Sequence, residues 1–205
     1  MVFSNEASDA YQHLIKLGSK KLSEFLGQHG PITIPKRYGE DPLMGLCRIV
    51  VGQQLSGHAA QAIWSGITAA FPDRNTRLVA FQNQNSDLTG LSNAKRNTLQ
   101  VIALHGDSWI DQTLNLDANA RRAALIAVKG IGPWTIAMWE LFVLAEPDCW
   151  SDGDLILKRI SARLAEEQAI DRRDWVALAS PFRSYLALFC WAIHDQGMLA
   201  DVPIR

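Results

Sequence analysis

Apolar residues recur at helical spacing, three or four positions apart, along almost the whole chain. Alternation of apolar and polar residues, the mark of a half-buried strand, is scarce and is confined to the short segment PITIP at 31–35. The pattern therefore predicts an all-α fold. The chain of 205 residues is 48% hydrophobic and 20% charged. Since it also lacks an apolar run of the roughly 18 residues needed to span a bilayer, we expect a globular protein outside the membrane.

Glycine, proline and capping residues divide this pattern into separate helices. We expect helices over 6–27 with Gly27 at its end, over 42–71 with a break at 52–56, within 75–90, over 92–106, from 117 or 119 to 128, from 134 to about 144, from 154 onward, and over 174–195. Ser92 is the expected N-cap of one helix, and either Asp117 or Asn119 caps the next. No internal repeat interrupts this series.

The overall charge excludes one way of binding nucleic acid. The formal net charge is −1 and the sequence pI is about 6.5, so the chain cannot bind nucleic acid through a strongly basic total. A local basic face or main-chain N–H groups could still hold a few phosphates.

The cysteines and histidines predict no metal site built from side chains. Cys47, Cys149 and Cys190 lie far apart, which excludes clustered iron–sulfur or zinc spacing, and the five histidines show no ligand spacing either. The segment 1–16 has acidic and polar residues where a secretory signal would be basic and then apolar, so we expect a cytoplasmic or nuclear protein. We also expect a monomer.

The stretch VKGIGPWTIAMWELF at 128–142 interrupts the helical pattern with two glycines and a proline. Two helices joined by such a short turn form a compact hairpin, and the second helix presents free N–H groups that attract anions. Gly130 and Gly132 would let the backbone approach a phosphate closely, and Pro133 suits a first helical turn. A tight turn between packed helices is the purely structural interpretation.

Three segments together carry a family resemblance. LIAVKGIGPWTIAMWELF and DCWSDGDLILKRI resemble the helix–hairpin–helix (HhH-GPD) DNA glycosylases, and RIVVGQQLSGHAAQAIW resembles the DNA-3-methyladenine glycosylase II type within them. The resemblance covers most of residues 40–197. It implies one all-α domain of two lobes, about 40–125 and 1–39 plus 126–205, with the hairpin at about 120–144 and the cleft between the lobes.

The resemblance assigns the chemistry to Asp154, at the expected start of a helix. Hydrolysis of an N-glycosidic bond passes through a cationic sugar, which a carboxylate beneath it stabilises, and the carboxylate can also orient water. A helix N-terminus favours the charged carboxylate. Asp152 is the neighbour to exclude. A structural alternative remains, since the four residues from Ser151 to Asp154 match a capping box.

The resemblance also implies a pocket for a flipped base. It places Trp134 and Trp191 there, with Trp150 and Tyr185 as weaker candidates, because aromatic faces hold an extruded, electron-poor base. Trp134 occupies the place where strand-cutting relatives carry a lysine, which implies base excision without strand cleavage. The remaining tryptophans are expected in the core: Trp64, Trp109, Trp139 and Trp175.

DNA-binding residues are implied at three places. Either Gln54 or Leu55 in the GQQLS turn would fill the gap left by the flipped base. The residues implied as DNA-binding are Gln53, Gln54, Leu55, Lys95, Lys129, Gly130 and Gly132, with Arg96 beside Lys95. The basic side chains could equally be ordinary surface charges. The resemblance further implies a monovalent cation, Na⁺ or K⁺, held by the main-chain carbonyls of Ile126, Val128 and Ile131.

The function implied is monofunctional hydrolysis of alkylated purines, chiefly 3-methyladenine, from double-stranded DNA in base excision repair. No cofactor is expected apart from the cation. Two alternatives stay open. One is a glycosylase of the same fold that acts on uracil, hypoxanthine or an oxidised base. The other is a non-catalytic module that uses the hairpin to grip phosphates.

Overall fold

The computed structural model describes residues 5–83 and 85–198, and within these ranges it contains helices and no strand. The prediction of an all-α fold is therefore confirmed. The chain separates into two compact units. One comprises Lys36–Trp139, and the other comprises the residues up to Pro35 together with those from Glu140 onward.

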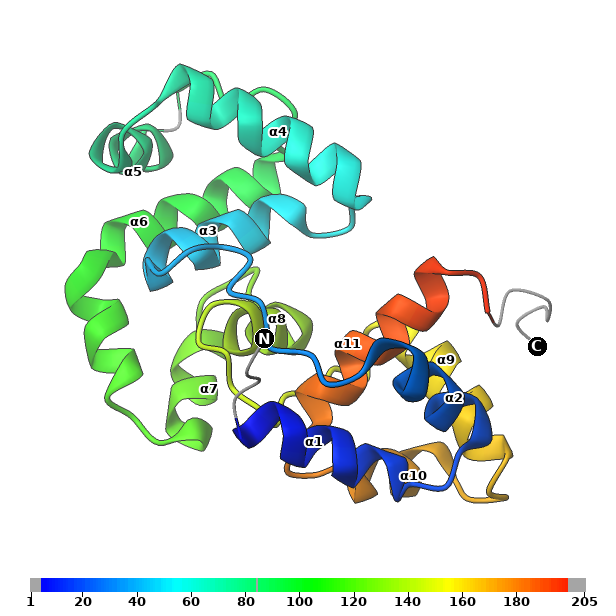
Figure 1. The fold of residues 1–205 in the computed structure, drawn as a ribbon. Coiled ribbons are helices and arrows are strands. Elements are labelled where there is room, and N and C mark those ends of the chain that lie inside the picture. The colour runs from blue at the N-terminus through cyan, green and yellow to red at the C-terminus, as the bar shows by residue number, and fades with distance from the viewer. Residues whose placement is uncertain (1–4, 84, 199–205) are drawn as a thin grey trace. The chain divides into compact units, whose positions relative to one another are not determined.

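The first unit, Lys36–Trp139, is built around a long central helix. Its helices are α3 (Pro42–Gly52), α4 (Gly57–Ala70), α5 (Arg74–Gln82), α6 (Asn93–Leu114), α7 (Ala118–Ile126) and the start of α8 (Pro133–Phe142). α6 packs against α3, α5 and α7, as Figure 1 shows, and α3 also packs against α4. Fully buried side chains between α3 and α6 include Leu43, Leu46, Leu99 and Ile102.

Local capping signals set several helix starts in this unit. The Ser92 side chain accepts from the N–H of Lys95 and caps α6, as predicted. Of the two alternatives for the next helix, Asp117 is the cap, because its carboxylate accepts from the second and third N–H groups that follow it. The break after α3 lies where the sequence predicted it. Gly106, with φ of 67°, kinks α6 at the point where a helix end was predicted.

The second unit packs α11 (Arg183–Asp195) against α9 (Leu155–Glu166) and α1 (Asn5–Ile15). α2 (Lys20–His29) packs on α1, and α10 (Arg172–Leu178) packs on α9 (Figure 1). The largest fully buried side chains here include Trp175, Phe25 and Leu14.

The prediction of one helix over 6–27 is wrong. Gly18 has a φ of 80°, which ends the helical path, and Ser19 then caps α2 by accepting from the N–H of Leu22. Gly27 lies inside α2, and Gly30 ends that helix instead. A glycine in the left-handed region followed by a capping serine therefore outweighs a continuous apolar periodicity.

The two compact units divide inside α8, between Trp139 and Glu140, and the predicted division into lobes at about residue 125 stays a prediction.

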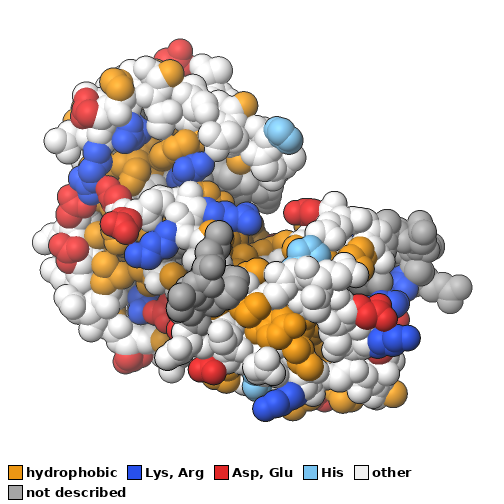
Figure 2. Space-filling model, in the orientation of Figure 1, with side chains coloured by type: hydrophobic (Ala, Val, Ile, Leu, Met, Phe, Trp, Pro, Cys, Tyr) orange, Lys and Arg blue, Asp and Glu red, His pale blue; other side chains and the backbone are white. Residues whose placement is uncertain are grey.

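The surface and the helices add two observations. In the face drawn in Figure 2, positive and negative side chains are interspersed, in keeping with a net charge of −1. Among the helices that the structure describes, none is both long and apolar enough to cross a bilayer.

Candidate functional site

Asp154 is the N-cap of α9. Its Oδ1 accepts hydrogen bonds from the backbone N–H groups of Ile156 and Leu157, each 3.0 Å long. Asp154 is half-buried, and the next residue, Leu155, is 78% exposed, so the start of α9 lies at the protein surface. The capping box read from Ser151 is wrong in detail, since Asp154 itself caps the helix. Ser151 instead accepts, through its carbonyl, from the N–H of Asp154 at 3.2 Å.

Trp191 on α11 lies beside this carboxylate. Its indole Nε1 is 3.5 Å from Oδ1 of Asp154, and its ring stacks on Phe142 with 5.6 Å between centroids and 27° between planes. Trp191 is half-buried and Phe142 is buried. The structure therefore brings the predicted catalytic carboxylate together with one predicted base-pocket ring, and it gives that ring a fixed support.

Trp150 and Asp152 form a second, separate pair near the start of α9. The Trp150 indole donates to Asp152 Oδ1 at 3.4 Å, and Nη1 of Arg172 donates to the same oxygen at 2.8 Å. Burial acts to raise the pKa of Asp152, but the hydrogen bond and charge of Arg172 outweigh it and lower the pKa. The Asp152 carboxylate is therefore paired with Arg172 on α10.

Tyr185 does not behave as a base-pocket residue in this structure. It is only 2% exposed, and its hydroxyl donates to Oε1 of Glu6 on α1 at 2.5 Å. Burial, reinforced by the neighbouring Glu6 carboxylate, raises the pKa of its phenol. Tyr185 is thus a core residue that joins α11 to α1, and its expected place in the pocket is corrected accordingly.

The hairpin between α7 and α8 is packed tightly on α6. Gly130 has a φ of 95°, and a Cβ atom there would lie 2.0 Å from Oγ1 of Thr98. The same hydroxyl donates to the carbonyl of Lys129 at 3.1 Å. A Cβ on Gly132, by contrast, would meet nothing within 4 Å. Packing within the protein therefore requires a glycine at 130 but not at 132.

Gln53 directly follows α3 in the GQQLS turn, and its side chain links this turn to the hairpin. Its Nε2 donates to the carbonyl of Gly130 at 3.0 Å and to Oγ1 of Thr135 at 2.8 Å. This side chain therefore makes protein contacts, whereas a DNA contact was implied. The next two residues differ: Gln54 is exposed with a φ of 56°, and Leu55 is 38% exposed.

Lys95 and Arg96 hold backbone carbonyls of their own unit. Nζ of Lys95 donates to the carbonyl of Val51 at 2.8 Å, and burial lowers the pKa of this lysine. Arg96 donates to the carbonyls of the loop before α6, at Ser86, Leu88 and Leu91. The implied role of these two side chains in binding the DNA backbone stays a prediction. Lys129, in the hairpin, is exposed.

The remaining residues of the hairpin complete its turn and the first turn of α8. The carbonyl of Val128 accepts from the N–H of Ile131 at 3.0 Å, which closes the turn, and Trp134 is half-buried in the first turn of α8. Within the described ranges, no group of three or more His, Cys, Asp or Glu residues could hold a metal ion. The cation at the carbonyls of Ile126, Val128 and Ile131 stays a prediction.

The other tryptophans are mostly core residues. Trp139 and Trp175 are fully buried, and Trp64 is nearly so, which confirms their predicted role. Trp109 is only half-buried and stacks on His105 with 4.9 Å between ring centroids.

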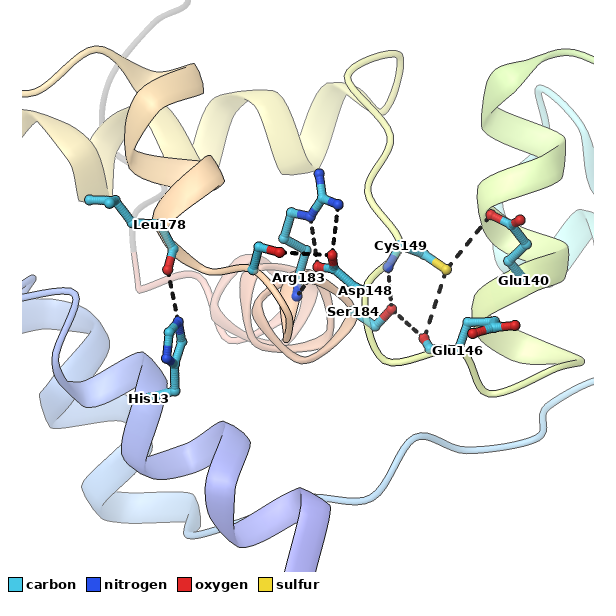
Figure 3. A network of polar contacts seen from close by, with 9 residues as sticks. His13, Glu140, Glu146, Asp148, Cys149, Leu178, Arg183 and Ser184 are labelled. Atoms are coloured by element: carbon cyan, nitrogen blue, oxygen red, sulfur yellow. Dashed lines mark hydrogen bonds and ion pairs between the residues drawn. The ribbon is translucent and has the colours of Figure 1, made fainter. Parts of the chain in front are cut away.

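A polar network that no sequence motif indicated holds the loop between α8 and α9 (Figure 3). Asp148 accepts from the backbone N–H and the guanidinium of Arg183 at 2.7 to 3.1 Å, and from Oγ of Ser180 at 2.9 Å. Burial alone would raise the pKa of Asp148, but the hydrogen bonds from Arg183 and Ser180 outweigh it and lower the pKa. The loop before Asp154 is thus fastened to the start of α11.

Ser184 completes this network from the buried side. Its Oγ donates to the carbonyl of Glu146 at 2.6 Å and accepts from the N–H of Cys149 at 2.8 Å. Sγ of Cys149 lies 3.8 Å from Oε2 of Glu140, near the end of α8 (Figure 3). Since 35 or more positions separate Ser184 from the loop residues, no local pattern could have indicated these contacts.

Comparison with known proteins gives a consistent result. No model of a known protein family matches the chain. It is 22% identical to the alkylbase DNA glycosidase-like protein mag2 of Schizosaccharomyces pombe, over 92% of this chain and 95% of mag2. It is 26% identical to DNA-3-methyladenine glycosylase 1 of the same yeast, over 91% of this chain and 86% of that protein.

A solved structure has the same fold. The 3-methyladenine DNA glycosylase Mag1 of Schizosaccharomyces pombe, solved in complex with abasic DNA, matches with a TM-score of 0.71 and 24% identity, over 96% of this chain and all of that one. The chain therefore has the same fold as this solved glycosylase, which agrees with the all-α fold expected from the resemblance.

Proposed function

We propose that this protein is a DNA glycosylase that hydrolyses the N-glycosidic bond of alkylated purines, chiefly 3-methyladenine, in double-stranded DNA. Similarity to two alkylated-base glycosylases supports the activity. The observation that carries the proposal is the pairing of Asp154 and Trp191, a carboxylate at a surface helix start with an aromatic ring beside it. A module that only binds DNA needs neither group.

Asp154 is the proposed catalytic residue. Two backbone N–H groups and the Trp191 indole converge on Oδ1, so the orientation of the carboxylate is fixed before substrate arrives. A fixed negative group beneath the deoxyribose stabilises positive charge that develops at C1′ as the base departs. The base leaves with the electron pair of the glycosidic bond, a water oxygen then bonds to C1′ and passes one proton to solvent, and an abasic site remains.

Trp191 is the proposed stacking surface for the flipped base, with Trp134 and Trp150 as further aromatic candidates. Phe142 supports one face of Trp191, so the indole keeps its plane when a base arrives. A purine made cationic by alkylation is attracted to an indole face by the electrostatic effect that draws cations to aromatic rings. Extrusion from the stack also costs least for a damaged or weakened pair.

The hairpin is the proposed phosphate grip. Gly132 leaves room beside the backbone that no protein atom fills, which is the space a phosphate needs to approach the N–H groups at the start of α8. The exposed pair Gln54 and Leu55 supplies the candidates for the side chain that fills the gap in the duplex. A cation at the hairpin carbonyls would add positive charge at the same place.

We further propose that the enzyme is monofunctional and acts as a monomer on DNA in the nucleoid or nucleus. Schiff-base chemistry at the sugar requires a primary amine, and Trp134 stands where strand-cutting relatives have a lysine.

A base-release assay tests the proposal. Purified protein is incubated with duplexes that contain one methylated, deaminated or oxidised base, and the free base is measured. Release of 3-methyladenine supports the proposal, and release of only uracil, hypoxanthine or an oxidised purine favours the alternative glycosylase. DNA binding without release of any base favours the non-catalytic module.

A further inference from the structure

The segment from Glu146 to Asp154 is attached at both of its ends to one helix. Ser184, in the first turn of α11, holds the backbone of Glu146 and Cys149, and Trp191, further along α11, contacts Asp154. Trp191 lies seven positions after Ser184, which is about two helical turns or roughly 10 Å along the axis. α11 thereby fixes the distance between the two attachment points.

The attachment at Ser184 is a buried one. Ser184 is fully buried, and its hydroxyl serves one N–H group and one carbonyl of the loop at 2.8 and 2.6 Å (Figure 3). Loss of a buried partner is costly because the groups left behind keep their desolvation penalty. The loop would therefore shift to recover those hydrogen bonds, and the shift would be passed along five residues to Asp154.

We propose that Ser184 is a positioning residue for base excision, which sets the place of Asp154 relative to Trp191 by holding the loop before α9. The proposal rests on the proposed function, because it needs Asp154 as the reacting carboxylate. Misplacement of a catalytic group by about 1 Å can lower a rate by roughly 100-fold. Ser184 touches neither base nor sugar in this scheme.

The chain offers a matched control in Ser19. This serine is also buried, also bridges two segments of the same unit, and makes two comparable bonds, to Glu167 at 3.0 Å and from the N–H of Leu22 at 3.2 Å. Neither of these two bonds involves the loop before α9. Ser184→Ala and Ser19→Ala should therefore both lower stability, but only the first should lower the rate of excision.

The rate is measured in single-turnover base release from a 3-methyladenine duplex, well below the melting temperature of both variants. Ser184→Ala is expected to excise at least 10-fold more slowly than wild type, with the Kd for DNA changed less than twofold, and Ser19→Ala is expected to keep the wild-type rate. If Ser184→Ala does not fold, Ser184→Cys keeps a weaker donor and acceptor and should give an intermediate rate.

A second measurement does not depend on activity. In protein with ¹⁵N-labelled tryptophan, the indole N–H signal of Trp191 reports its contact with Asp154, and that of Trp175 reports its hydrogen bond to the carbonyl of Leu17, two residues before Ser19. The Ser184 variant should move the Trp191 signal, and the Ser19 variant the Trp175 signal. Each signal is assigned by substitution of its tryptophan with phenylalanine.

The outcomes separate the two proposals. Equal excision rates for Ser184→Ala and wild type, with an unmoved Trp191 signal, overturn the positioning role and leave the glycosylase intact. A wild-type protein that releases no base from any duplex contradicts the proposed function itself.

Discussion

The indole N–H of Trp191 points to the same oxygen of Asp154 that caps α9, at a distance of 3.5 Å. Asp154 thus has an observed structural role as a helix cap and a proposed catalytic role beside a ring suited to stacking. The two tasks differ in energy, since loss of a cap costs about 1 kcal/mol of folding stability, whereas loss of a charge facing a sugar cation costs about 3 kcal/mol or more of activation free energy.

Asp154→Asn should therefore separate the two roles. An asparagine still caps a helix, so we expect the free energy of unfolding to fall by less than about 1 kcal/mol, while base release slows by roughly 100-fold or more because the charge is gone. Asp171→Asn is the control, since Asp171 caps α10 in the same unit and accepts from the N–H of Arg173. Wild-type excision by a folded Asp154→Asn protein would exclude Asp154 as the catalytic group.

Gly130 and Gly132 should respond differently to alanine. Gly130→Ala places a Cβ against Thr98 and strains a φ of 95°, so we expect a loss of about 3 kcal/mol in the free energy of unfolding. Gly132→Ala meets no protein atom and should change stability by less than about 1 kcal/mol. It should nevertheless weaken DNA binding, because the methyl group occupies the proposed path of a phosphate. Unchanged DNA affinity in Gly132→Ala would argue against a phosphate at the hairpin.

Two lysines should differ in the salt dependence of DNA binding. Lys129 is exposed in the hairpin, so Lys129→Ala should reduce the slope of log K against log salt by about 1 if it contacts one phosphate. Lys95 is committed to the carbonyl of Val51, so Lys95→Met should lower thermal stability and leave the slope unchanged. Binding titrations from 50 to 200 mM salt measure both slopes. A reduced slope in Lys95→Met would show that its ammonium leaves Val51 for the DNA.

Strand integrity tests the consequence of Trp134. The product of excision should stay uncut until it is heated or treated with alkali, and borohydride should trap no covalent protein–DNA adduct, because residue 134 has no amine. Denaturing gels with and without alkali measure strand cleavage. Slower migration of the protein on a denaturing gel after borohydride treatment would reveal a covalent adduct. Cleavage of the strand by the untreated enzyme would mean that another amine attacks the sugar.

The ion pair between Asp148 and Arg183 should contribute stability that depends on pH. The pKa of Asp148 is lowered in the folded protein, so its contribution is fully present above the unfolded value, near 3.9, and is lost as the pH falls through the lower folded pKa. At pH 7 we expect Asp148→Asn to cost about 1 to 2 kcal/mol, because both side chains are partly exposed.

Denaturant unfolding of wild type and Asp148→Asn between pH 7 and pH 3 measures that difference. The gap between the two proteins should shrink only below about pH 4. A gap that stays constant down to pH 3 would show that the stabilisation does not come from the Asp148 charge.

Local signals were enough to predict much of the fold. Ser92, Asp117 and Pro133 begin helices where the sequence indicated, because a capping side chain or a fixed φ acts within a few residues. The apolar periodicity runs on through Gly18 and Ser19, so it does not reveal the break between α1 and α2 that these two residues make.

The parts of the site that depend on tertiary packing could not be predicted in this way. Whether the ring of Tyr185 faces the core or a pocket depends on where α1 lies, and whether Lys95 faces solvent depends on the end of α3. The bonds of Ser184 join residues far apart in the chain. A family resemblance can identify the reacting residues. The contacts that hold them form between segments far apart in the sequence, so they depend on how the helices pack.

The hydrogen bonds of Gln53 hold the GQQLS turn against the hairpin. Because this amide joins the GQQLS turn to the carbonyl of Gly130, the distance between exposed Leu55 and the hairpin backbone, the proposed phosphate site, is set by the fold. If a duplex contacts both Leu55 and the hairpin backbone, its own spacing must match the distance between them. The turn and the hairpin would then hold two points of the duplex at a set distance, and a duplex that bends readily would match that distance at the lowest cost.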